Sequence, residues 1–115
     1  MPGIDIAEYV NIEEGLNRLR GNKAIYARML KLFLAGEELS GFEAAIGRGD
    51  LKEAANVAHA IKGVAGNLSL NKLFELSALL MAKLRAGERD EAMIANFLTV
   101  AANTRESVNA VINEL

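Results

Sequence analysis

The sequence has 115 residues, 51% of them hydrophobic, with one histidine and no cysteine. A chain of this length fits one domain, and its apolar fraction argues against disorder. The net charge of −2 gives no basic footprint for a nucleic acid, and the lack of cysteine excludes disulfides and thiolate metal sites. The single histidine, His59, excludes any site that needs two.

Targeting and membrane-spanning segments are not evident in the sequence. The first five residues have no basic start, and the longest apolar runs, such as 32–35 and 78–82, are far shorter than the ~20 residues of a membrane span. The absence of cysteine fits the cytosol. We therefore expect a cytoplasmic protein that inserts into no membrane and binds no nucleic acid.

Turn and capping residues divide the chain into helices. The composition is rich in alanine and leucine, which predicts an all-α fold. Glycine after a helix, and Asn, Asp or Ser before the next, marks breaks at residues 20–22, 47–50, 66–69 and 86–90. These breaks predict a short helix over 11–20 and longer helices over 23–46, 51–66, 70–86 and 90–113. Asp50, with Glu53 three residues later, is expected to cap the third of these five.

Each long segment carries apolar side chains at helical spacing, and such wide stripes with short connections favour antiparallel neighbours. We expect an antiparallel up-down four-helix bundle over residues 23–113. Residues 1–22, with the short additional helix, would cap it, and residues 1–115 would form a single domain. Arg105 is the one charged side chain within the apolar stripe of the last helix.

His59 lies beside the core stripe of the helix over 51–66, where side chains reach solvent. Lys62 follows it at i+3, Gly63 at i+4 and Gly66 at i+7, so all four share one band. Each glycine inside a helix costs about 1 kcal/mol relative to alanine. We therefore expect the two glycines to provide steric clearance next to the ring. A histidine is largely neutral near pH 7 and can act as a nucleophile, and the Lys62 ammonium suits a phosphate.

These residues resemble a known family. The run from His59 to Ala65 (HAIKGVA), with Leu68 three residues later, is similar to the signature of histidine-containing phosphotransfer (HPt) domains. A second stretch resembles the first helices of HPt modules appended to hybrid sensor kinases; it comprises Gly15, Leu16, Arg18, Leu19, Gly21, Asn22, Tyr26, Leu30 and Phe33. Ser69 stands where many members have glycine, and Leu79 and Leu80 stand near a position that is often acidic.

The resemblance implies a phosphorelay intermediate. His59 would accept a phosphoryl group from the aspartyl phosphate of a response-regulator receiver domain and pass it to another receiver, with Lys62 supplying phosphate electrostatics. A hybrid sensor kinase, in cis or in trans, would be a further partner. Mg²⁺ is expected on the receiver, so this chain would need no metal or cofactor. The sequence has no glycine-rich nucleotide loop after a strand, and we expect no ATP-dependent kinase activity of its own.

The small side chains flanking His59 predict where a receiver would dock. We expect the contact to include Ala55, Asn56, Ala60 and Asn67, together with part of the exposed side of the helix over 23–46. Bulky residues near the ring would then hinder the approach of the partner.

Two alternatives remain open. The chain could be a helical interaction or adaptor module with an incidental surface histidine, in which Ala55, Ala60 and Gly63 dock a partner helix. In that case Gly63 and Gly66 would be packing sites and Lys62 a solvated lysine. A cofactor-binding four-helix bundle fits less well, because carboxylate-bridged metal sites need Glu-x-x-His pairs on two helices and the chain has one histidine.

Overall fold

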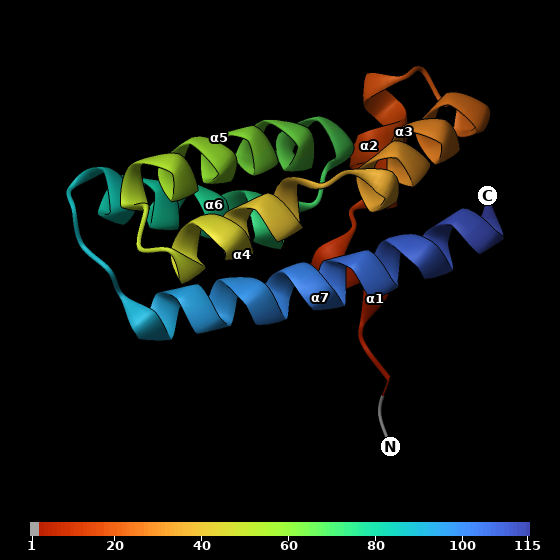
Figure 1. Ribbon diagram of the computed structural model, residues 1–115. Coiled ribbons are helices and arrows are strands. Elements are labelled where there is room, and N and C mark those ends of the chain that lie inside the picture. The colour runs from red at the N-terminus through yellow and green to blue at the C-terminus, as the bar shows by residue number, and fades with distance from the viewer. Residues whose placement is uncertain (1–2) are drawn as a thin grey trace.

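The computed structural model describes residues 3–115, and all the regular elements in that range are helices (Figure 1). They are α1 (Ile6–Tyr9), α2 (Ile12–Arg18), α3 (Lys23–Ala35), α4 (Glu38–Gly47), α5 (Leu51–Leu68), α6 (Asn71–Arg85) and α7 (Glu91–Glu114). The helix α5 packs between α4 and α6, while α7 packs against α6 and α3. The predicted all-α helical bundle is confirmed. No helix within residues 3–115 has the length and apolarity to cross a membrane.

Asparagine and aspartate side chains begin five of the helices, and Asp5 at the start of α1 is the first of them. Asp50 accepts a hydrogen bond from the Glu53 N–H at 3.0 Å, which confirms the predicted cap of α5. Asn11, Asn22 and Asp90 accept in the same way at the starts of α2, α3 and α7. Each of these side chains satisfies one backbone N–H that the first turn of a helix leaves without a partner. The helix starts are therefore determined largely by local sequence.

The predicted continuous helix over 23–46 is wrong, because the chain breaks between α3 and α4. Gly36 adopts an extended conformation (φ −68°, ψ 157°), and the Glu38 carboxylate lies where a Cβ on Gly36 would be. The Arg105 guanidinium of α7 donates to the Leu34 carbonyl oxygen at 2.9 Å. This contact satisfies a carbonyl at the end of α3, so the one charged side chain in the α7 stripe stabilises the break.

The N-terminal residues lie against the bundle rather than apart from it. The short helix α1, which the sequence did not predict, packs on α6 and α7, and α2 packs on α3. Tyr9 and Val10 are buried, and Asn103 of α7 donates from its side-chain amide to the Tyr9 hydroxyl at 3.0 Å. The predicted helix over 11–20 corresponds to α2, which is shorter and runs from Ile12 to Arg18.

The core joins the helices through a few large side chains and many small ones. Tyr26, Phe42 and Phe97 are the largest fully buried side chains, and the rings of Phe42 (α4) and Phe97 (α7) lie 4.8 Å apart between centroids. On α5 the buried face consists mainly of alanines, among them Ala58 and Ala65. Small side chains let neighbouring helices approach closely, which holds α5 firmly with its opposite face outward.

Candidate functional site

His59 lies on the outward face of α5. The buried positions Ala58 and Ile61 turn toward the core, while His59 and Ala60 are exposed. Because α5 is packed on both flanks and capped at its start, the imidazole is held on a rigid element and is open to solvent. This placement leaves the ring accessible to a large partner.

A ridge of small and amide side chains follows α5 next to His59. Asn56, Ala60, Gly63 and Asn67 are all exposed, and their spacing of i, i+4, i+7 and i+11 places them along one side of the helix. We call these four residues the α5 ridge. The expectation that Ala55 is exposed is wrong, since its side chain is only 2% exposed. With α4 and α6 packed on its two flanks, α5 buries a wider arc than the sequence pattern indicated.

The two glycines of the histidine band differ in their surroundings. A Cβ on Gly63 would meet no heavy atom within 4 Å beyond its own helix, so this side of His59 is open. A Cβ on Gly66 would lie 3.1 Å from two ring carbons of Phe74 on α6. The expectation that Gly66 leaves room for an incoming group is therefore wrong, because Phe74 takes that room.

Lys62 extends over the same aromatic ring. Its Nζ atom lies 5.7 Å from the centroid of Phe74, and the residue is half-buried. None of the ion pairs formed within residues 3–115 involves Lys62. Its positive charge is therefore not neutralised by a carboxylate, and it lies one helical turn from His59.

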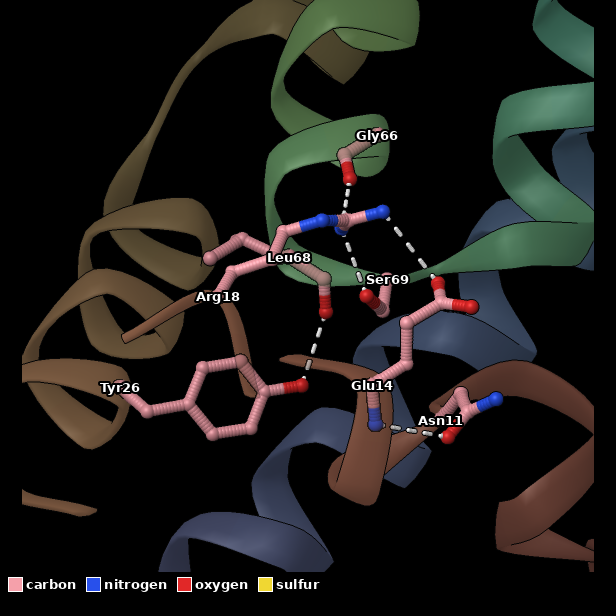
Figure 2. Close-up of polar contacts among 7 residues, drawn as sticks. All are labelled: Asn11, Glu14, Arg18, Tyr26, Gly66, Leu68 and Ser69. Carbon is pink, nitrogen blue, oxygen red and sulfur yellow. Dashed lines mark hydrogen bonds and ion pairs between the residues drawn. The ribbon is translucent and has the colours of Figure 1, made fainter. Parts of the chain in front are cut away.

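The C-terminal end of α5 is held by side chains from α2 and α3 (Figure 2). The Arg18 guanidinium donates to the Gly66 carbonyl oxygen and, at 2.7 Å, to the Ser69 hydroxyl. The Tyr26 hydroxyl donates to the Leu68 carbonyl oxygen at 2.8 Å. The last carbonyls of a helix have no partner within it, so these contacts supply what α5 lacks. From the sequence we expected no role for Arg18 or Tyr26 beyond their place in the resemblance.

Tyr26 is fully buried at this junction, and burial raises the pKa of its phenol to about 12. Gly15 of α2 makes room for the ring, because a Cβ there would lie 2.5 Å from the Tyr26 hydroxyl oxygen. The close approach of the Tyr26 ring to the α2 backbone thus explains the glycine at position 15. The phenol stays protonated and remains a hydrogen-bond donor well above neutral pH.

An apolar hollow of about 260 Å³ opens on the side of α5 that faces α3. Its walls include Met29, Leu32 and Phe33 of α3 and Val64 and Asn67 of α5. Leu32 is 66% exposed, and Ile25, two turns earlier on α3, is 42% exposed. Asn67 also belongs to the α5 ridge, so the ridge and this apolar surface are continuous. Within residues 3–115 no group of three or more acidic or histidine side chains is arranged to hold a metal ion.

A protein-family model described as the Hpt domain matches residues 28–112. The chain belongs to the Hpt domain family. Hpt domains perform histidine phosphotransfer in two-component phosphorelays and interact with response-regulator receiver domains. The matched segment of this Hpt domain contains all of α4, α5 and α6 and most of α7, and so includes His59 and Lys62. No curated protein and no solved structure gives a significant match to the chain.

Proposed function

We propose that His59 is the phosphoacceptor of a phosphorelay and exchanges phosphoryl groups with receiver domains. The observation that carries this proposal is the exposed imidazole on α5, one turn from the unneutralised Lys62 ammonium. A ring nitrogen forms the new P–N bond while the P–O bond to the receiver aspartate breaks, and the carboxylate leaves with the electron pair. The reverse step, on a second receiver, returns His59 to its free form.

Lys62 and Gly63 have separate parts in this step. The ammonium offsets the negative charge of the phosphoryl oxygens, which an exposed histidine alone would leave unpaired. Gly63 leaves open space beside the ring, where a receiver must bring its aspartyl phosphate in line with the attacking nitrogen. The Mg²⁺ ion that the reaction needs would be bound by the receiver. This chain acts as a phosphocarrier in the cytoplasm and has no kinase reaction of its own.

The docking surface proposed for the receiver is the α5 ridge and the exposed apolar side of α3. The ridge presents little side-chain bulk, and Ile25 and Leu32 offer apolar area that the bundle leaves uncovered. Exposed apolar area bordered by polar groups is typical of protein interfaces. Ala55 is not part of this proposed surface, because its side chain is buried in the core.

Transfer from a phosphorylated receiver tests the proposal. A panel of purified receiver domains, charged with acetyl phosphate and radiolabelled, is mixed with the wild-type chain and with His59→Gln. Wild type is expected to take up a label that is labile in acid and stable in base, and His59→Gln none. ATP alone should label neither protein. Full labelling of His59→Gln would exclude this histidine, and an unlabelled wild type that binds its partner irrespective of His59 and Lys62 would favour the adaptor function.

The same assay examines the docking surface. Ala60→Gln adds bulk to the α5 ridge and is expected to slow transfer from the receiver without loss of helicity. Glu43→Gln, at an exposed position on α4 away from the ridge, is the control and should transfer at the wild-type rate. Equal rates for both variants would remove the ridge from the interface.

A further inference from the structure

Phe74 is held in a fixed position against the histidine helix. Only Ser69 and Leu70 separate the end of α5 from the start of α6, so the two helices have little freedom to slide past one another. The ring of Phe74 consequently lies against the backbone at Gly66, where any Cβ would be 3.1 Å from two of its carbons. The lack of a side chain at Gly66 is what lets the ring reach this place.

The face of this ring is occupied by the Lys62 ammonium. Lys62 precedes Gly66 by four residues and lies on the same side of α5. Its Nζ atom is 5.7 Å from the ring centroid, within the roughly 6 Å over which an aromatic face attracts a cation. No ion pair involving Lys62 is formed by residues 3–115, so the ammonium lies over the ring without a carboxylate partner.

An aromatic partner has a chemical advantage over a carboxylate at this position. A carboxylate would neutralise the ammonium and would have to be displaced when a phosphoryl group arrives. An aromatic ring restricts the rotamers of the lysine side chain but leaves its full charge and its N–H donors available. Restraint before the reaction reduces the entropy lost when the ammonium meets the phosphoryl oxygens.

We propose that Phe74 is a positioning residue: its ring holds the Lys62 ammonium beside His59, ready to meet the phosphoryl group. This inference rests on the proposed function of His59 as the phosphoacceptor. It adds an aromatic residue from a second helix to a site that otherwise lies entirely on α5.

Phosphoramidate, a small donor, tests the proposal without a receiver and its docking surface. The imidazole nitrogen forms a P–N bond while the bond from phosphorus to the amide nitrogen breaks, and ammonia leaves. Phe74→Leu keeps apolar bulk but removes the aromatic face, and its labelling rate is expected to fall about two- to fivefold. Phe74→Tyr keeps the face and should label at the wild-type rate. A wild-type rate for Phe74→Leu, or an equal loss for Phe74→Tyr, would overturn the proposal.

A double-mutant cycle shows whether Phe74 acts through the lysine. In a Lys62→Met background the ammonium is gone, so Phe74→Leu should cause no further decrease in rate. A merely structural role would slow labelling by the same factor in both backgrounds, and that result would refute the positioning role.

The NMR shift of the Lys62 ε-methylene protons provides an independent readout. A group above an aromatic face is shifted upfield by the ring current, and we expect this shift in wild type and its loss in Phe74→Leu. Gly66→Ala should reduce it, because the added methyl meets the ring, while Gly63→Ala adds the same methyl where nothing lies within 4 Å and should leave it unchanged. Equal shifts in wild type and Phe74→Leu would contradict the proposed contact.

Failure of this inference differs from failure of the proposed function. If wild type takes up no label from either donor, His59 is not a phosphoacceptor and both proposals fall. If wild type is labelled and Lys62→Met is slower, but Phe74→Leu matches wild type, the function stands and the role of Phe74 is rejected.

Discussion

Ser69 shows how a single residue can occupy a conformation that usually favours glycine. It ends α5 in the left-handed region, with φ 59° and ψ 40°, where a residue with a side chain pays about 1–2 kcal/mol. The same side chain is fully buried, and its hydroxyl accepts a hydrogen bond from Arg18 at 2.7 Å. Contact with an arginine offsets the backbone strain, so serine here gains a partner that glycine would lack.

Tyr26 leads to a prediction about alkaline stability. Its pKa is raised to about 12 by burial, whereas an unfolded tyrosine titrates near 10. The stabilisation from the neutral phenol is therefore complete below about pH 10 and is lost as the pH rises toward 12. At pH 8, Tyr26→Phe should lower the free energy of unfolding by about 1 kcal/mol, because the Leu68 carbonyl loses its donor.

The difference in unfolding free energy between wild type and Tyr26→Phe should then shrink above about pH 10 and reverse in sign before about pH 12, since phenylalanine has no proton to lose. Urea unfolding of both proteins at a series of pH values measures this difference. Every other titrating group is present in both proteins, so its contribution cancels when their unfolding free energies are subtracted. A difference that stays constant from pH 8 to 12 would mean that the Tyr26 phenol titrates alike in the folded and unfolded states.

At the scale of the helices, arginine side chains supply the partners that helix ends lack. Arg18 binds the end of α5, Arg89 donates to the Ile46 carbonyl oxygen near the end of α4 at 2.9 Å, and Arg105 does the same at the end of α3. All three residues lie far along the sequence from the carbonyls that they bind. The ends of these helices are therefore fixed by the tertiary fold, whereas the starts of α3 and α5 are capped by the local side chains of Asn22 and Asp50.

Arg105 provides the test at this scale. Arg105→Gln removes the charged donor to Leu34, and hydrogen bonds to charged groups contribute about 1.5–3 kcal/mol. We expect the free energy of unfolding to fall by about 1–2 kcal/mol, measured by urea denaturation. Arg28→Gln, an exposed arginine on α3, makes the same chemical change and should leave stability within about 0.5 kcal/mol. Equal losses in the two variants would show that Arg105 does not stabilise the break.

The same distinction explains what the sequence could predict. Cap residues such as Asp50 and Asp90, together with apolar periodicity, predict α5, α6 and α7 to within two residues, because those signals are local. The break at Gly36 was missed because the apolar spacing continues across it and its stabilising partner, Arg105, is remote. Ala55 and Gly66 were misplaced for a similar reason: the burial of a small residue depends on how closely the neighbouring helix approaches.

For the whole molecule, the N-terminal segment that precedes the family match, residues 3–27, contacts the helix that carries His59. The family match begins at residue 28, so Arg18 and Tyr26 precede it. Both nevertheless bind the last carbonyls of α5, which lie about 10–14 Å along the helix from His59 at 1.5 Å per residue. The rigidity of the histidine helix thus depends partly on residues outside the segment that defines the family.

Hydrogen exchange measures this dependence. Arg18→Gln removes the donor to Gly66 and Ser69, and the amides of Ser69 and Leu70, which close the last turn of α5, should exchange roughly tenfold faster or more. Amides around His59 should change little, since α4 and α6 hold that part of the helix. Arg20→Gln, an exposed neighbour, is the control. Unchanged exchange at Ser69 and Leu70 in Arg18→Gln would mean that the α5 terminus is held by α6 alone, and that the N-terminal segment only covers it.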